Sequence, residues 1–292
     1  MDITTQILNS VAIGITILVN SAASYGLFGS ESIKTTSDRR KNAFTPYFWV
    51  ILIIWFVIYG WSITWNVWTY ITPSLFTATL TKVPYNWIVE GVLNCAWIFL
   101  FTFKYYTYSM WVIILYMTSI LATYFMAGVY YYAGQSNEQR FVEFGSISIR
   151  LGWLFVATIL MFFSTLSVKK TKQKTAVWTC ILILLMVNGF WMVYFRDFIV
   201  AIPLFVALVG IAIEQYYAKE AVNMLPGDEW IRKESTVVNR TVDYEVSLGS
   251  DEKESRKDLL DEQNLPSVFF GSVVSALIVL ICIVVRIVIL YQ

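Results

Sequence analysis

Long apolar stretches dominate this 292-residue chain and limit what it can fold into. A membrane-spanning helix needs roughly 20 apolar residues. Eight windows meet or approach that length, at 5–27, 46–69, 86–103, 105–132, 147–167, 176–195, 197–217 and 267–290. Hydrocarbon offers no water to backbone polar groups, so only helices and closed barrels can cross it, and continuous apolar runs lack the alternation of barrel strands. The sequence therefore predicts an all-α, polytopic membrane helix bundle with about eight transmembrane helices, surrounded by the lipid bilayer.

The composition excludes several functional classes. The chain is 58% hydrophobic and only 14% charged, whereas soluble domains carry about 25% charged residues. The net charge is +1 and no basic cluster alternates with aromatic residues, so we expect no nucleic-acid partner. Histidine is absent, and the three cysteines stand alone in apolar runs at Cys95, Cys180 and Cys282. Metal sites need clustered ligands, so we expect neither a metal nor a cofactor.

The polar segment 218–265 divides the chain into three parts. It contains 7 Lys or Arg and 12 Asp or Glu residues, too little apolar surface to offset the entropy lost on ordering. We therefore expect a transmembrane bundle over 1–217, which includes the windows from 5–167 and the two at 176–217. An acidic flexible linker then covers 218–265, and a C-terminal transmembrane helix covers 266–292.

The positions of Lys and Arg predict the orientation in the membrane, because translocated loops are depleted of them. With eight spans, one side of the membrane has most of the basic residues, namely Lys34, Arg39, Arg40, Lys41, Lys104, Lys169, Lys170, Lys172, Lys174 and those of 218–265. The opposite loops hold Lys82, Arg140 and Arg196. We therefore expect 218–265 to be cytoplasmic and both termini to be non-cytoplasmic. Neither the organelle nor the oligomeric state, whether a homodimer or a larger membrane complex, follows from the sequence.

Aromatic residues recur at helical spacing in the second window. They make one wall of that helix aromatic, through Trp55, Tyr59, Trp61, Trp65 and Trp68. Such rings either line a ligand cavity or simply pack against neighbouring helices, as most aromatic residues in a bundle do. The spacing alone is compatible with both interpretations.

A second face, on the third window, mixes rings with polar groups. It consists of Trp87, Glu90, Asn94, Trp97 and Phe101. Glu90 either anchors the polar end of a ligand or reaches interfacial water near the helix end. Asn94 either contacts a ligand or bonds to another helix. Two further ionisable residues in apolar windows, Arg150 and Arg286, are expected to extend toward water at the membrane surface.

These features favour a binding cavity over an active site, because no nucleophile–base pair accompanies the rings. We therefore expect no enzyme and no catalytic residue. A channel or transporter is an alternative, supported only by Pro203 as a proline deep in a span. A structural subunit of a larger membrane complex is another. A cavity of several hundred Å³ would distinguish ligand binding from plain packing.

Three short motifs lie in order on the second, third and fifth windows. They are Pro46 with Trp55 to Tyr59, Leu93-Asn94 with Trp97, and Gly152-Trp153 with Ala157, preceded by Leu27-Phe28-Gly29 at the end of the first window. In these motifs the chain resembles the long branch of the tryptophan-rich sensory protein and translocator protein family, also called peripheral-type benzodiazepine receptor-like proteins. The resemblance covers 5–167 and extends more loosely through the next two windows.

The resemblance implies a five-helix core with an aromatic pocket for porphyrins, sterols or synthetic aromatic ligands. It implies a receptor, sensor or transport protein whose site is lined by Trp55, Tyr59, Asn94, Trp97 and Trp153, with Glu90 added from the face described above. Two positions depart from the family pattern. Ile149 and Arg150 replace a Pro-Tyr pair, and Met161 replaces an asparagine.

The predicted orientation can be tested by glycosylation mapping. Acceptor sites inserted separately into 28–45 and 218–265 should both stay unmodified, because the Lys/Arg distribution places both segments in the cytoplasm. A site inserted at the N-terminus is the positive control and should be glycosylated. If 28–45 and 218–265 report opposite sides of the membrane, the count of eight spans is wrong.

Overall fold

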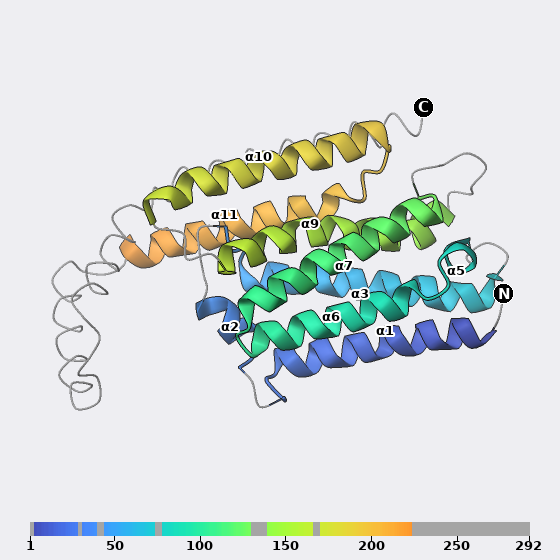
Figure 1. The fold of residues 1–292 in the computed structure, drawn as a ribbon. Coiled ribbons are helices and arrows are strands. Elements are labelled where there is room, and N and C mark those ends of the chain that lie inside the picture. The colour runs from blue at the N-terminus through green and yellow to red at the C-terminus, as the bar shows by residue number, and fades with distance from the viewer. Residues whose placement is uncertain are drawn as a thin grey trace.

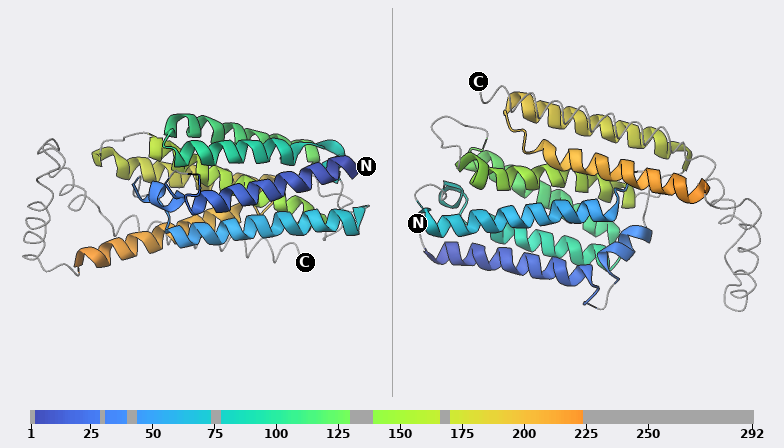
Figure 2. Two further views of the ribbon diagram at one scale, coloured as in Figure 1. Left: turned by 90° about the horizontal axis from the view of Figure 1, so that it is seen from below. Right: turned by 180° about the vertical axis from the view of Figure 1, so that it is seen from behind.

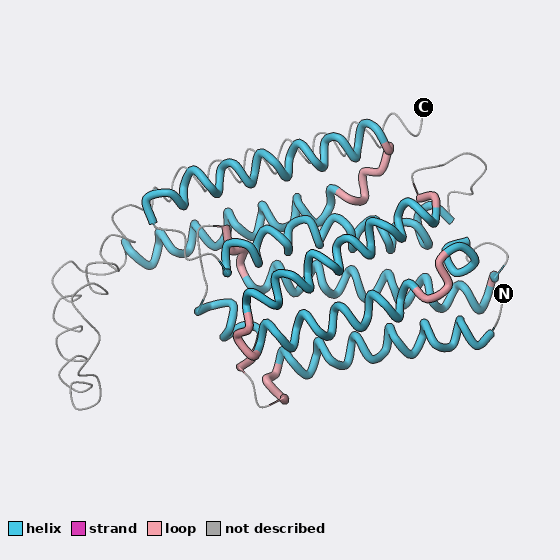
Figure 3. Tube along the Cα trace, viewed as in Figure 1, coloured by secondary structure: helices cyan, strands magenta, loops and turns pink. Residues whose placement is uncertain are grey.

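The computed structural model describes residues 3–28, 31–39, 44–73, 78–129, 139–165 and 170–223. All regular secondary structure in these residues is helical. Within these residues the bundle has seven long helices, α1 (Ile3–Ser24), α3 (Phe48–Ile71), α6 (Asn86–Thr102), α7 (Tyr106–Ala127), α9 (Gly145–Thr165), α10 (Lys170–Tyr194) and α11 (Ala201–Asn223). Short pieces join them at α2 (Ile33–Arg39), α5 (Ala78–Lys82) and a π-helical turn, η1 (Arg140–Phe144). The described part contains no strand, so the all-α prediction is confirmed (Figure 3).

The first seven apolar windows each coincide with one long helix. The eighth window, 267–290, and most of the predicted linker lie outside the described residues. At the start of that linker, α11 continues to Asn223, past the end predicted at 217. Pro203 lies in the first turn of α11, because the helix begins at Ala201 and not at 197. A proline is readily accommodated there, so the proline that favoured a transporter does not break a span.

Four helical segments in the described residues are long and apolar enough to cross a membrane. They are Ile3–Ser24, Phe48–Ile71, Tyr106–Ala127 and Phe141–Thr165. Three shorter apolar segments accompany them, at Asn86–Thr102, Trp178–Tyr194 and Ala201–Tyr217. The protein is therefore an integral membrane protein, while the count of eight spans stays a prediction.

Successive long helices run in alternating directions, so the connections gather at two ends of the bundle (Figures 1 and 2). The N-terminus and α5 lie at one end, and α2 lies at the other with the turn between α6 and α7. Lys34 and Lys104 are at the α2 end, where they pair with Asp38 at 2.7 Å and Glu31 at 2.9 Å. These two basic residues therefore lie at the same end of the bundle, while the orientation in the membrane stays a prediction.

Helix α9 is the most enclosed helix of the bundle, since 72% of its most apolar window is buried inside the protein. It packs against α7, α11, α3 and α10, whereas α6 lies between α1 and α7 (Figure 1). Polar groups on α9 therefore have no direct route to surrounding water. They must find partners inside the protein, either on their own helix or on neighbouring helices, because an unpaired polar group costs free energy in an apolar interior.

Two glycines allow α11 to approach its neighbours at backbone distance. A Cβ atom at Gly152 would collide with the carbonyl of Val200 and lie 3.2 Å from Pro203 Cδ. At Gly210 a Cβ would lie 2.9 Å from Pro46 Cβ, and the Gly210 carbonyl accepts the Tyr47 N–H at 2.9 Å. Small residues commonly serve this purpose between membrane helices. Through them α11 is fixed against both α9 and α3.

Asp197 fastens the connection between α10 and α11 to the bundle. Its carboxylate accepts hydrogen bonds from Ser148 Oγ at 2.5 Å, Tyr124 Oη at 3.1 Å and the Ile199 N–H at 3.0 Å. Burial raises the pKa of Asp197, although the bonds from Ser148 and Tyr124 act in the opposite direction. One carboxylate thus joins α7, α9 and the start of α11.

We expect Gly152→Ala to lower the thermal unfolding midpoint of the purified protein. The new methyl group would meet backbone atoms of Val200, which cannot move aside as a flexible side chain can. Gly60→Ala is the matched control, because nothing lies within 4 Å of a Cβ at Gly60. That change should be neutral or stabilising by up to about 1 kcal/mol, since alanine favours helix. Equal midpoints for the two variants would contradict the close approach of α9 and α11.

Candidate functional site

One face of α6 points into the bundle over its whole length. Trp87, Glu90, Asn94, Trp97 and Phe101 are all buried, as their helical spacing predicts. The facing surface of α7 is buried at the same spacing, through Ser109, Ile113, Tyr116, Ile120 and Thr123. The mixed ring-and-polar face of α6 is therefore interior.

Glu90 and Arg150 form a buried ion pair between α6 and α9. Arg150 Nη1 donates to Glu90 Oε2, and the side chains of Arg150 and Glu90 are only 5% and 1% exposed. Thr123 Oγ1, on α7, donates to the other Glu90 oxygen at 3.1 Å, and Arg150 Nε donates to the Ser146 carbonyl at 2.9 Å. The pair thus ties three helices together.

The expectation that Arg150 extends toward the membrane surface is wrong, and so is the interpretation that places Glu90 in interfacial water. Arg150 lies on the most enclosed helix, where its nearest compensating charge is Glu90. Its guanidinium also lies over the Trp87 ring, with Cζ 3.5 Å from the ring centroid. A cation in this position is attracted by the negative face of the ring.

Aromatic rings from three helices meet beside this ion pair. Trp55 of α3 stacks with Tyr59 at 5.3 Å and with Trp97 of α6 at 6.2 Å between ring centroids, and its edge contact with Trp153 of α9 measures 5.8 Å. These four residues were predicted as a ligand site from sequence. The structure brings them together, with Trp55 at the centre.

The rest of the aromatic wall on α3 is divided among other neighbours. Trp65 is fully buried and stacks on Trp87 at 5.0 Å. Trp61 donates its indole N–H to the Phe141 carbonyl at 2.9 Å, and Trp68 is exposed. A single helix face is thus split between the site and ordinary packing, because different helices cover its two halves.

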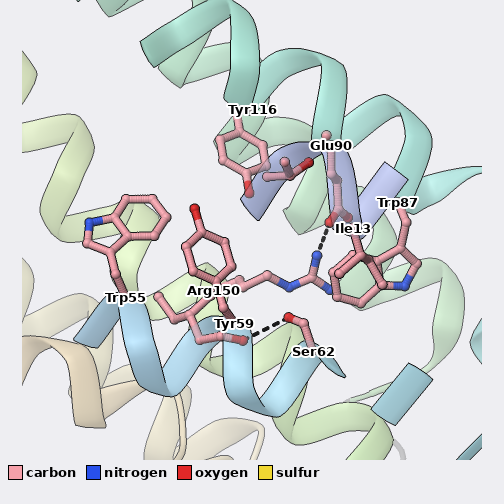
Figure 4. Close-up of a pocket in the computed structure, with 11 residues that line it drawn as sticks. Ile13, Trp55, Tyr59, Ser62, Trp87, Glu90, Tyr116 and Arg150 are labelled. Carbon is pink, nitrogen blue, oxygen red and sulfur yellow. Dashed lines mark hydrogen bonds and ion pairs between the residues drawn. The ribbon is translucent and has the colours of Figure 1, made fainter. Parts of the chain in front are cut away.

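Two small cavities adjoin Trp55 on either side. The first, of about 30 Å³, lies at the ion pair and is lined by Ile13, Thr16, Trp55, Ile58, Tyr59, Ser62, Trp87, Glu90, Gly91, Tyr116 and Arg150. In Figure 4, Arg150 reaches toward Glu90 with Trp87 on one side and Tyr59 and Tyr116 on the other. Trp55 is the only predicted site residue that borders both cavities.

The second cavity lies toward the α2 end and has a volume of about 80 Å³. Its lining comes from α2, α3, α6 and α9 and the residues before α3, namely Ile33, Ser37, Thr45, Pro46, Phe48, Ile51, Trp55, Trp97, Phe101, Trp153, Ala157, Leu160, Met161 and Ser164. A water molecule needs roughly 10–15 Å³ by this measure. The smaller cavity therefore has room for about two or three waters and the larger for about five to eight. Both volumes are well short of the several hundred Å³ that a preformed ligand pocket would have.

Asn94 lies on the same α6 face but lines neither cavity. Its Oδ1 accepts a 2.5 Å hydrogen bond from Asn20 Nδ2 on α1, so it bonds to another helix. A role for Asn94 in ligand binding stays a prediction.

Arg150 and Tyr116 border the smaller cavity but were not predicted from the sequence as site residues. The residues around Arg150 in the sequence do not indicate its role, because its partner Glu90 is 60 residues away in the chain. Tyr116 could have been found, since its buried face on α7 repeats with helical spacing.

Comparison with known protein families matches residues 6–226 to the family described as TSPO-like protein. The match spans most of the chain and includes the seven long helices of the described part, except for the first three residues of α1. It agrees with the family resemblance seen in the sequence motifs. No curated protein and no solved structure matches the chain.

We expect removal of either charge in the buried pair to be strongly destabilising. Glu90→Ala and Arg150→Ala should each cost about 3–5 kcal/mol, since each leaves an uncompensated buried charge. The double variant Glu90→Gln/Arg150→Met has no buried charge and should recover most of that loss. Thermal unfolding in detergent measures all three.

The exposed pair Lys34–Asp38 provides the control for this comparison. Asp38→Ala should cost less than about 1 kcal/mol, because solvent screens an exposed pair. If the double variant Glu90→Gln/Arg150→Met is no more stable than Glu90→Ala and Arg150→Ala, the two side chains are not coupled.

Proposed function

Because the chain belongs to the TSPO-like protein family, we propose that it binds a hydrophobic aromatic or sterol-like ligand, of the porphyrin or sterol class, around Trp55. In this proposal the protein is not an enzyme and serves to sense or transport that ligand. The observation that carries the proposal is the position of Trp55. Its ring contacts Tyr59, Trp97 and Trp153 and borders both cavities.

The chemistry of the lining supports a planar or fused-ring ligand. Indole and phenol faces present large apolar surfaces with a negative centre, and they stack well on other flat ring systems. Rings supplied by α3, α6 and α9 surround the same space, so a flat molecule would have aromatic contacts on more than one side. A flexible acyl chain would gain less from such surfaces.

The two cavities are too small to hold a ligand of this size without a change in the structure. Sites for ligands of this size usually enclose about 300–1,000 Å³, whereas the two cavities measure about 30 and 80 Å³. The rings must therefore move apart when a ligand enters. Rotation of the Trp55 side chain would enlarge the site most, because this side chain is half-buried and borders both cavities.

The environment of the charged groups supports binding over catalysis. Glu90 has both oxygens engaged, by Arg150 and Thr123, so it is not free to act as a general base. Neither cavity lining includes a cysteine that could serve as a nucleophile. The Glu90–Arg150 pair thus forms a polar end, without net charge, of a site that is otherwise mostly apolar.

Replacing Trp97 by alanine should weaken ligand binding by roughly 1 kcal/mol or more, because a stacking surface is lost. Binding constants can be obtained by titrating the full chain in detergent with mesoporphyrin IX and with cholesterol, following tryptophan fluorescence. Trp97 and Trp191 are matched in burial, at 9% and 8% exposed, but Trp191 borders neither cavity. Trp191→Ala is therefore the control and should leave the binding constant unchanged. Equal losses at both positions would favour plain helix packing over a ligand site.

A further inference from the structure

Several residues that line the cavities around Trp55 have a buried hydrogen-bond donor without a partner. Among the described residues that border either cavity, five buried side-chain atoms lack a hydrogen bond, and each is able to donate one: Tyr59 Oη, Trp87 Nε1, Trp97 Nε1, Arg150 Nη2 and Trp153 Nε1. Buried polar groups normally have a partner, so an accumulation of one kind requires an explanation. This excess of donors over acceptors indicates which hydrogen-bonding groups a ligand must supply.

These atoms cannot all satisfy one another by changing roles. An indole N–H and a guanidinium group donate only, and of the five atoms the Tyr59 hydroxyl alone can also accept. The one carboxylate at the smaller cavity is already engaged, because Glu90 accepts from both Arg150 and Thr123. A ligand group that fits here must therefore present acceptor atoms.

The charge balance decides which kind of acceptor is favoured. Arg150 is neutralised by Glu90, so the buried pair has no net charge. An ionised ligand carboxylate would add an uncompensated charge to an enclosed site, at considerable cost. A neutral carbonyl oxygen accepts hydrogen bonds without bringing a charge.

We infer that the polar end of the site recognises a neutral carbonyl group, a ketone, ester or amide, on a hydrophobic ring ligand. Arg150 Nη2 and Tyr59 Oη donate to its oxygen, while the ring system lies against Trp55, Trp97 and Trp153. This inference rests on the proposed function. It makes Arg150 and Tyr59 the residues that determine specificity, and Arg150 stands where the family pattern has a different residue.

A ketone and an alcohol on the same ring skeleton distinguish this inference from simple hydrophobic binding. An alcohol oxygen also accepts a hydrogen bond, but it brings its own hydrogen. Only the Tyr59 hydroxyl could accept that hydrogen, and Tyr59 could then no longer satisfy its own hydrogen on the ligand oxygen, so one polar hydrogen is left without a partner in either arrangement. Burying an unsatisfied polar hydrogen is unfavourable. We therefore expect cholest-4-en-3-one to bind about fivefold or more tightly than cholesterol, and mesoporphyrin IX dimethyl ester more tightly than the free diacid.

The experiment titrates the full chain in detergent with each member of the two pairs. Tyr59→Phe removes one donor while keeping the ring, and it should reduce the preference for the ketone. The double variant Glu90→Gln/Arg150→Met should reduce it further. Trp191→Phe is the matched control, because the Trp191 Nε1 is also buried without a partner but borders neither cavity. It should leave the ratio of affinities unchanged.

The outcomes separate the inference from the function on which it rests. Equal affinity for ketone and alcohol, or a ratio that neither Tyr59→Phe nor the double variant changes, overturns carbonyl recognition and leaves the ligand site standing. If neither member of either pair binds, the proposed function itself fails, and the inference fails with it.

Discussion

Arg150 places a positive charge on the most enclosed helix of a membrane bundle, and Glu90 compensates it from the neighbouring face of α6. Neither charge could remain there alone, because the surroundings offer no water. The pair therefore constrains how α6 and α9 can slide or rotate relative to one another. Thr123 extends the same constraint to α7. The aromatic site lies immediately beside this junction.

The geometry of the site follows from that constraint. With Glu90 directed at Arg150, the next turns of α6 place Trp97 beside Trp55, and the next turn of α9 places Trp153 against the same ring. Trp87 lies on the other side of the guanidinium and stacks on Trp65, so the ring contacts continue along α3. The polar pair and the ring cluster are thus two parts of one arrangement.

Close backbone packing holds the remaining helices around this centre. Gly152 and Gly210 let α11 approach α9 and α3, and Asp197 secures the turn that precedes α11. Membrane helices gain little from the hydrophobic effect against one another, so such van der Waals contacts and hydrogen bonds must supply their association. The small cavities fit this closely packed bundle. A bound ligand must therefore gain enough in ring contacts to offset the packing that it displaces.

Much of the bundle was predictable because the signals are local. Each of the seven apolar windows within the described residues became a helix, and the buried face of α6 followed from spacing alone. The family resemblance also grouped Trp55, Tyr59, Trp97 and Trp153, whose rings do meet in the structure, while their role in ligand binding stays a prediction. The direction of Arg150 was not predictable, because its helix position is equally compatible with an inward and an outward side chain.

The sequence by itself determined the class of the protein, since the length of an apolar run and a helical repeat are properties of neighbouring residues. It also determined which face of α6 is interior. Only the tertiary structure decided which charges are paired, because Glu90 and Arg150 are 60 residues apart. It likewise decided that Asn94 bonds to Asn20, 74 residues away, and that the rings around Trp55 leave two small spaces. These depend on how distant helices pack together, and apolar patterning constrains that packing only loosely.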